Sequence, residues 1–182
     1  MATRLARTDG LRGLSVRSVA AAAGVGATTL RTYFPSQALL YRAVAERLVS
    51  VALSDDRIRD SSLGPAERLY TSLRQFLPSS EYRQYALTVW FELITLAVGP
   101  DANAEVLELV NSGQAESVSI TTRWFKQLAD DGCALRESPE VLADRFETIV
   151  DGLQLHLLLD QDEAALGRAD DTVRWFVAQA LA

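Results

Sequence analysis

The sequence predicts an all-α protein in which a small three-helix head at the amino end precedes a larger helical body. Two observations support this prediction. Apolar residues recur at the spacing of amphipathic helices along most of the chain, and no stretch after residue 55 alternates as a half-buried strand would. In addition, glycine and proline divide residues 15–41, SVRSVAAAAGVGATTLRTYFPSQALLY, into short helical segments. We therefore expect a head at residues 1–50 and a body at residues 51–182.

The first helix of the head motif has a predicted start and a predicted end. Ser15 is a suitable N-cap, because its hydroxyl accepts from an otherwise unpaired N–H of the first turn. Gly24 stands where a helix ends in the left-handed conformation, which glycine adopts without a Cβ penalty. Val25 is expected to fill the space between this helix and the next. The predicted buried face consists of Val16, Val19, Ala20 and Ala23.

The second helix, about Ala27 to Phe34, is short and has two unlike faces. One face is apolar, and the other carries hydroxyls with an arginine at its flank: Thr28, Thr29, Thr32, Tyr33 and Arg31. Such groups can hydrogen-bond base edges and phosphates in the major groove, so the polar face predicts DNA binding. The alternative is an ordinary helical hairpin with a solvated polar face. Ser36 is expected to cap a third helix with an apolar stripe of Leu40, Val44, Leu48 and Val51.

The pieces SVRSVAAAAGV, TLRTYF and SQALLY resemble the DNA-binding domain of the TetR family of bacterial regulators, over about the first 50 residues. The resemblance implies that the short helix enters the major groove and that the starts of its two neighbours hold phosphates. Carried over by position, it implies DNA contacts by Ser15, Arg17, Gly26, Ala27, Thr28, Thr29, Arg31, Thr32, Tyr33 and Gln37. Three features depart from the family pattern. Arg31 replaces an aromatic residue, Gln37 replaces a phosphate-binding lysine, and only residues 2–9 remain for the preceding helix.

Charge is divided unevenly along the chain. Residues 1–50 hold seven arginines against Asp9 and Glu46 and carry +5, whereas the whole chain carries −6 and residues 51–182 carry −11. A basic head attracts a polyanion, and an acidic body is repelled by it. Taken alone, the same pattern also fits chance clustering of surface charge.

Several protein classes are excluded. No apolar run approaches the ~18 residues of a membrane span, and no apolar leader precedes the head. Cys133 is the one cysteine, so an internal disulfide is impossible and a cytoplasmic protein is expected. His156, the one histidine, stands among leucines and is expected in the core or an interface. Without a catalytic group, metal-ligand spacing or nucleotide-binding loop, we expect no enzyme and no cofactor.

The body is predicted to contain about five helices after a polar connector at residues 54–64. The first starts at Gly64-Pro65 and the second, about 80–98, ends before Gly99-Pro100. A long third helix begins at an Asp101 cap and reaches about residue 131. The fourth spans 139 to about 159, and the last begins near Ala169. Paired acidic residues such as Asp170 and Asp171 are expected at helix ends and on the solvated surface.

The body resembles the TetR ligand-binding domain more loosely, through its helix order and the segment RFETIVDGLQLHLLLD. In that family the last two helices of each protomer form a dimer interface, which implies a homodimer here. The implied interface residues are Leu153, Leu157, Val173, Phe176, Val177 and Leu181, with packing inside the monomer as the alternative. The family also implies an apolar effector cavity, with Leu73, Trp90, Ile94, Thr121, Trp124, Phe125, Phe146 and Val150 as candidates. Plain core packing is the alternative for each of them. Because no buried lysine or arginine is expected at the centre, a neutral or weakly polar lipophilic effector is favoured.

These features predict a homodimeric, ligand-responsive transcription factor that represses from a palindromic operator and is released by a small molecule. The alternative is an all-helical small-molecule binding or interaction module that has lost tight DNA binding. Double-stranded DNA, a lipophilic effector and a second copy of the chain are the expected partners, and a membrane is not.

Overall fold

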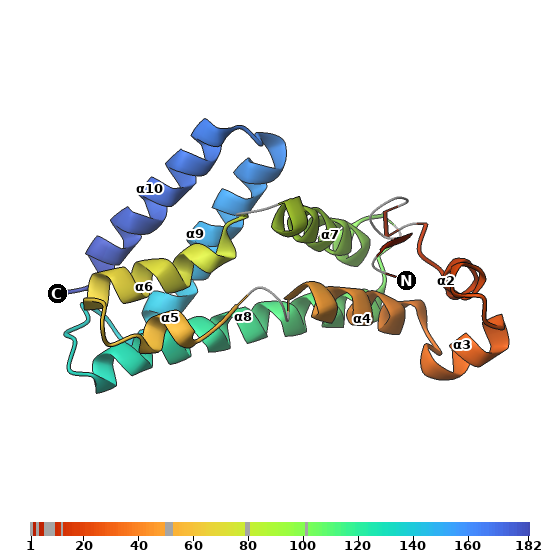
Figure 1. Cartoon of the computed structure of the whole chain (residues 1–182), viewed down its shortest axis with the longest axis horizontal. Helices are drawn as coiled ribbons and strands as arrows, with labels where there is room; N and C mark the ends of the chain where they lie inside the picture. The colour runs from red at the N-terminus through yellow and green to blue at the C-terminus, as the bar shows by residue number, and fades with distance from the viewer. Residues whose placement is uncertain are drawn as a thin grey trace. The chain divides into compact units, whose positions relative to one another are not determined.

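The computed structural model describes residues 2, 4–5, 10–11, 13–49, 53–78, 81–100 and 102–182. Over these ranges all regular structure is helical except for an isolated antiparallel bridge between Leu135 and Leu181 (Figure 1). The all-α prediction is therefore confirmed. No helix in the described part of the chain has the length and apolarity needed to cross a bilayer.

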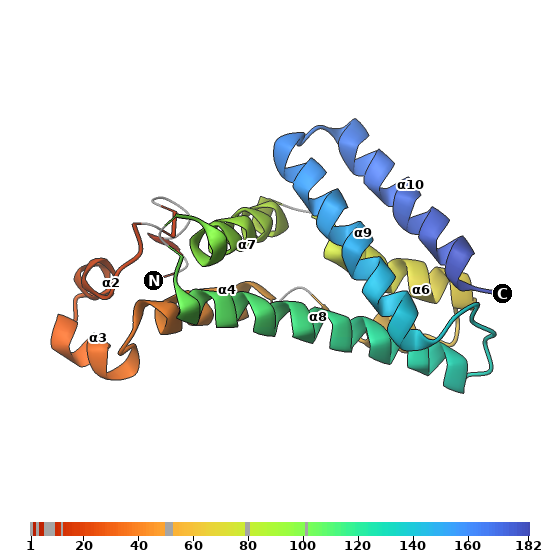
Figure 2. The same ribbon diagram turned by 180° about the vertical axis from the view of Figure 1, so that it is seen from behind.

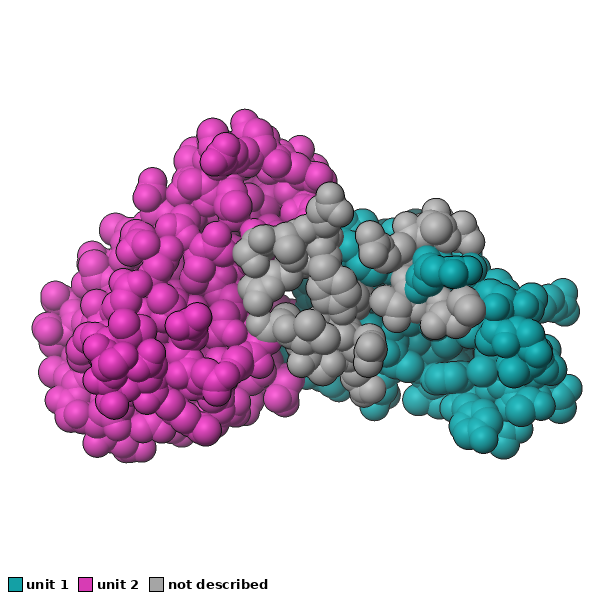
Figure 3. All heavy atoms as spheres, viewed as in Figure 1, with its two compact units in different colours: residues 1–51, 85–113 teal, residues 52–84, 114–182 magenta. Residues whose placement is uncertain are grey.

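The chain folds into two compact units (Figure 3). Unit 1 consists of residues 1–51 and 85–113, and unit 2 of residues 52–84 and 114–182. Two long helices, α7 (Glu81–Val98) and α8 (Ala104–Asp130), contribute residues to both units. The compact units thus divide the chain differently from the head and body of the sequence, whose division at residue 50 stays a prediction.

Unit 1 contains α2 (Val16–Ala23), α3 (Ala27–Tyr33) and α4 (Gln37–Val49). The Ser15 hydroxyl accepts from Ser18 N–H as the predicted N-cap, and Gly24 ends α2 with φ of 68°. Ser36 Oγ accepts from Leu39 N–H at 3.3 Å near the start of α4. The buried apolar residues of unit 1 include Leu11, Leu14, Val19, Ala20, Leu40, Val44, Val89 and Leu93.

Some residues of the predicted head core are solvent-exposed. Ala23 and Val25 are exposed, and α3 has no fully buried residue. The expectation that Val25 fills the space between α2 and α3 is therefore wrong: Val19 and Ala20 form the buried face of α2 instead. The Leu48 side chain and Val51 lie outside the described residues.

Unit 2 contains α5 (Asp56–Arg59), α6 (Pro65–Leu73), the 3₁₀ turn η1 (Arg74–Phe76), α9 (Pro139–Leu159) and α10 (Glu163–Ala180). Helices α9 and α10 lie side by side and antiparallel, as both ribbon views show (Figures 1 and 2). Helix α6 packs against α10, and α5 packs against α6.

Three expected boundaries in the body differ from the structure. The predicted polar connector, residues 54–64, contains the short helix α5, whose Ile58 side chain is apolar and buried. Helix α10 starts at Glu163 rather than near Ala169, because Asp162 caps it by accepting from Ala165 N–H. Helix α8 starts at Ala104, where Asn103 Oδ1 accepts from Val106 N–H at 3.1 Å, and the expected cap Asp101 lies outside the described residues.

Candidate nucleic-acid interface and ligand region

Helix α3 presents its predicted polar face to solvent. Thr28, Thr29, Arg31 and Thr32 are exposed, and Tyr33 is 74% exposed. The Thr32 hydroxyl donates to the Thr28 carbonyl at 3.3 Å, one turn back along the helix. Gly26 and Ala27, at the start of α3, are exposed as well. The face that the sequence assigns to DNA is therefore open along its whole length.

The start of α2 is held by a reciprocal capping box. Ser18 N–H donates to Ser15 Oγ at 3.0 Å, and Ser15 N–H donates to Ser18 Oγ at 2.9 Å. Such a pair satisfies two backbone donors that a helix start otherwise leaves free. The Ser15 hydroxyl therefore fixes where α2 begins, and Arg17, two residues later, is exposed beside it.

Gln37, at the position of the family's lysine, is engaged within the head. Its amide Nε2 donates to the Leu14 carbonyl at 3.0 Å and to the Tyr41 hydroxyl at 2.5 Å. The substitution thus replaces a cation with an amide that joins the start of α4 to the turn before α2. Contact between Gln37 and DNA stays a prediction.

The positive charge of unit 1 belongs to its amino-terminal segment. Arg4, Arg17, Arg31 and Arg42 are exposed, and none forms a salt bridge with another residue in the described part of the chain. Residues 85–113 contribute four acidic and no basic side chains, so unit 1 as a whole carries +1. A polyanion would therefore be attracted to the amino-terminal segment, residues 1–51, rather than to unit 1 as a whole.

The eight candidate ligand residues are divided between the units. Leu73, Thr121, Trp124, Phe125, Phe146 and Val150 are buried in unit 2, whereas Trp90 and Ile94 are half-buried in unit 1. In unit 1, a Cβ at Gly113 would lie 3.0 Å from Trp90 Cη2 and Cζ3, so a glycine allows α8 to approach the indole. The six residues in unit 2 share one compact core with aromatic packing.

A chain of ring contacts forms the centre of this core. The Phe76 ring lies edge-on to Trp124 at 5.9 Å and to Phe146 at 5.4 Å between centroids. Phe146 contacts Phe176 at 5.5 Å, and Phe125 contacts Phe176 at 6.3 Å. The edge-to-face pairs among them, such as Phe76 with Trp124, add to the stabilisation from burial alone.

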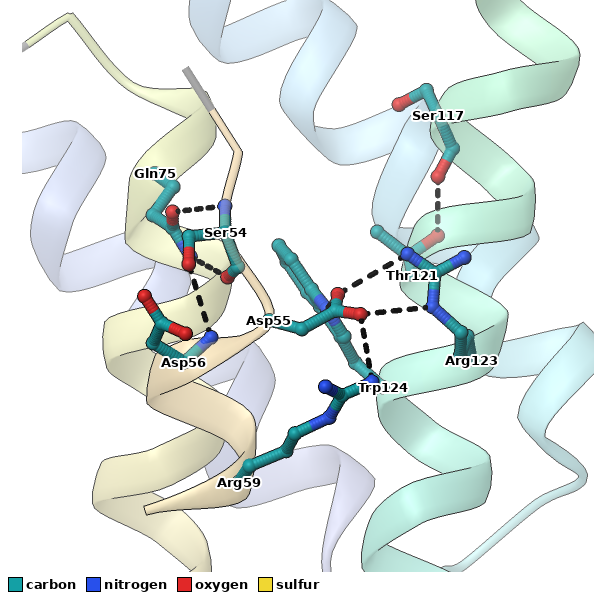
Figure 4. A network of polar contacts seen from close by, with 9 residues as sticks. All are labelled: Ser54, Asp55, Asp56, Arg59, Gln75, Ser117, Thr121, Arg123 and Trp124. Carbon is teal, nitrogen blue, oxygen red and sulfur yellow. Dashed lines mark hydrogen bonds and ion pairs between the residues drawn. The ribbon is translucent and has the colours of Figure 1, made fainter. Parts of the chain in front are cut away.

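The polar groups expected to bind a ligand already have protein partners (Figure 4). The Thr121 hydroxyl donates to the Ser117 carbonyl of its own helix at 3.1 Å. The Trp124 indole N–H donates to Asp55 Oδ1 at 2.7 Å, and Arg123 forms a salt bridge to the same carboxylate at 3.1 Å. Burial would raise the pKa of Asp55, but the hydrogen bonds from Arg123 and Trp124 outweigh it and hold the pKa below its usual value.

Two carboxyl groups that the sequence did not lead us to expect lie between α8 and α9. Glu147 is only 8% exposed and accepts a hydrogen bond from the Ser117 hydroxyl, and Asp151 Oδ2 accepts from Gln114 Nε2 at 2.9 Å. Burial raises the pKa of Glu147 to about 7 and also raises the pKa of Asp151. Helical spacing could have indicated the burial of Glu147, since Glu147 lies four residues after the buried Ala143 and therefore on the same face of α9.

Other charges inside unit 2 are paired. Arg68, the buried cation that the sequence did not lead us to expect, donates to the Ile58 carbonyl at 2.7 Å and forms a salt bridge with Asp131. Asp170 lies within α10 rather than at a helix end, and it accepts from the Tyr70 hydroxyl at 2.8 Å and from Arg74. Burial and this contact with Asp170 raise the pKa of Tyr70.

The predicted dimer residues lie mainly inside the protomer. Leu157, Val173, Phe176 and Val177 are buried, and Leu153 and Leu181 are half-buried. Four of the six therefore have no free surface for a partner, because they pack against their own chain. The large apolar side chains that α9 and α10 expose are Val141, Leu155, Leu159 and Trp175.

His156 is exposed on α9 rather than in the core, and its place in an interface stays a prediction. Among the described residues, no group of three or more His, Cys, Asp or Glu side chains is arranged to hold a metal ion.

Both parts of the chain match known protein families. Residues 1–44 match the family described as bacterial regulatory proteins of the tetR family, and residues 65–182 match the C-terminal domain of BetI-type transcriptional repressors. The HTH-type transcriptional regulator PksA of Bacillus subtilis (strain 168) is 28% identical over 156 residues, covering 83% of this chain and 72% of PksA.

Solved structures share the fold over nearly the whole chain. A structure from Rhodococcus sp. described as a TetR-family transcriptional regulator has a TM-score of 0.80 at 20% identity, covering 100% of this chain and 94% of that one. A transcriptional regulator from Saccharomonospora viridis, solved in complex with choline, has a TM-score of 0.73 at 19% identity, covering 99% and 93%. The chain belongs to the TetR family of bacterial transcriptional regulators, as a DNA-binding repressor with a C-terminal ligand-binding domain.

Proposed function

We propose that this repressor binds a palindromic operator as a homodimer and leaves it when a small molecule binds its C-terminal domain. The observation that carries the DNA half of the proposal is the open face of α3, where Thr28, Thr29 and Thr32 are exposed. Threonine hydroxyls bond base edges and their methyl groups contact thymine, so this face is suited to direct readout in the major groove.

Phosphate contacts are assigned to the residues around α3. Arg17 and Arg31 are exposed and lie on the two helices of the motif, where they would set its register on the duplex. Ser15, Gly26, Ala27, Tyr33 and Gln37 complete the proposed contact set.

A homodimer suits this role, because two recognition helices that read a palindrome need a separation of about 34–36 Å. We assign the partner surface to the exposed side chains of α9 and α10, which are Leu155, Leu159 and Trp175. Acting on DNA, the dimer would work in the cytoplasm, and no catalytic step is assigned to it.

The effector region is assigned to the aromatic core of unit 2 and the adjacent surface between α8 and α9. Neither Glu147 nor Asp151 has a salt-bridge partner among the described residues, so an anionic effector is disfavoured there. A neutral lipophilic or positively charged molecule is more suitable. It would act by binding more tightly to a conformer that does not fit the operator than to the conformer that does. Only such a difference in affinity shifts the equilibrium between the two conformers.

The test of the proposed DNA interface uses two substitutions in the head. Arg17→Ala removes a charge and Thr29→Ala a base-reading hydroxyl, so each should weaken binding of a palindromic fragment from the protein's own promoter by about tenfold. Matched controls are Arg57→Ala and Thr148→Ala, which remove the same groups from exposed positions of unit 2. Fluorescence anisotropy measures all four affinities, and unchanged binding in both head variants would refute the assigned face.

Salt titration separates this proposal from a binding module that has lost tight DNA binding. Exposed arginines that replace phosphate counterions give a steep fall of affinity with salt concentration. A weak and nearly flat response would favour the module, for which the uncharged Gln37 is the supporting feature.

A further inference from the structure

The turn that leads into α2 is held by a side chain from α7. The Leu11 N–H donates to Glu92 Oε2 at 2.6 Å, although the two residues are 81 positions apart. A Cβ at Gly10 would lie 3.2 Å from Glu92 Oε1, so the carboxylate lies directly against the backbone of the turn. The Leu11 side chain is fully buried, which anchors the same turn in the core of unit 1.

The same turn forms hydrogen bonds with α2 and α4, the two helices that flank α3. Leu14 N–H donates to the Leu11 carbonyl at 3.0 Å. The Leu14 carbonyl accepts from Gln37 at the start of α4 at 3.0 Å, and the Gly13 carbonyl accepts from the Ser18 hydroxyl of α2 at 3.1 Å. A displacement of the turn would therefore shift the starts of α2 and α4 together, and these are the proposed phosphate-binding ends.

Glu92 belongs to the part of the chain that matches the ligand-binding domain, residues 65–182, yet it lies in the same compact unit as the head. We propose that Glu92 is a positioning residue for operator binding. Its carboxylate holds the Leu11 N–H and thereby sets the orientation of α2 and α4 around the recognition helix. The same hydrogen bond joins α7, which belongs to the segment that matches the C-terminal domain, to the turn before α2. This inference rests on the proposed operator binding.

Three substitutions at Glu92 separate acceptor geometry from charge. Glu92→Ala removes both the acceptor and the charge, Glu92→Gln keeps an acceptor without the charge, and Glu92→Asp keeps the charge but shortens its reach. Glu105→Ala is the matched control, because it removes an exposed carboxylate from the same unit. Loss of a negative charge alone favours binding to a polyanion. Weaker binding in Glu92→Ala would thus be opposite in sign to the charge effect.

We expect Glu92→Ala and Glu92→Asp to bind the operator about tenfold more weakly, as loss of a charge-assisted hydrogen bond implies. Glu92→Gln should stay within about threefold of the parent protein, because its amide oxygen still accepts from the Leu11 N–H, although more weakly than a carboxylate does. In Glu92→Ala and Glu92→Asp, affinity for non-specific DNA should fall less than affinity for the operator, whereas a general loss of folded protein would lower both affinities equally. Hydrogen exchange at the Leu11 amide should become at least about tenfold faster in Glu92→Ala.

The inference is overturned if Glu92→Ala and Glu92→Asp bind operator as tightly as the parent protein, or if Glu92→Gln loses as much as Glu92→Ala. Parallel loss of operator and non-specific binding would overturn it as well. If the parent protein itself does not bind its promoter fragment, the proposed function fails instead. The exchange rate at Leu11 would then still test whether Glu92 holds the turn.

Discussion

The surroundings of Glu147 change its acid–base behaviour. Its carboxyl group is buried between α8 and α9, where the Ser117 hydroxyl donates to it and Asp151 lies one helical turn away. Burial disfavours the charged form, and the negative Asp151 acts in the same direction, so the pKa rises from 4.5 to about 7. The hydrogen bond from Ser117 opposes this rise without cancelling it.

The raised pKa predicts a pH-dependent stability that Glu147→Gln removes. The folded protein holds this proton more tightly than the unfolded chain, so the contribution of Glu147 to the free energy of unfolding is greatest below pH 4.5. That contribution falls between pH 4.5 and about 7 and is lowest above this range. Relative to the parent protein, Glu147→Gln should therefore gain on the order of 2 kcal/mol between pH 5 and pH 8.

Urea unfolding followed by circular dichroism across that pH range measures this difference. Glu116→Gln is the control, because Glu116 is exposed on the same helix as Ser117. Its stability should follow the parent curve at every pH. A Glu147→Gln curve parallel to the parent curve would show that Glu147 ionises normally in the folded protein.

At the scale of elements, the connection between α2 and α3 depends on one backbone conformation. Gly24 ends α2 with φ of 68°, and its N–H donates to the carbonyls of Ala20 and Ala21. No atom lies within 4 Å of a Cβ placed there, so a side chain would meet no neighbour. The cost of a substitution would come from the left-handed backbone alone.

Gly24→Ala should therefore lower the local stability of the head by about 1 kcal/mol. Gly24→Asn should cost less, because asparagine tolerates the left-handed conformation better than alanine does. Native-state hydrogen exchange of the α2 and α3 amides gives the order of stability. Equal protection in the alanine and asparagine variants would show that the conformation of Gly24 does not limit the head.

At the scale of the whole molecule, helices α9 and α10 expose several large apolar side chains. Leu155 and Leu159 share one face of α9, where Leu159 is 77% exposed, and Trp175 of α10 is 57% exposed. Exposed large apolar groups on neighbouring elements are typical of interaction surfaces. We therefore assign the proposed dimer contacts to these exposed residues rather than to buried ones such as Phe176.

Leu159→Arg should convert a dimer into a monomer, because it places a charge within the proposed contact. Sedimentation velocity measures the change, and operator affinity should fall with it because bivalent binding is lost. Val98→Arg is the control, since Val98 is 68% exposed but belongs to unit 1. A Leu159→Arg protein that remains dimeric would place the interface elsewhere.

The sequence by itself determined the helical class, the family and most helix boundaries. Ser15, Gly24 and Pro139 mark helix ends through contacts with residues a few positions away, and the polar face of α3 follows from the helical period. Only the tertiary structure decided which partner each face meets. Glu92 reaches Leu11, and Asp55 accepts from Trp124, across 81 and 69 positions of the chain. An apolar or polar stripe indicates that a face is buried or exposed, but the packing of several helices selects its neighbour, and no local period encodes that choice.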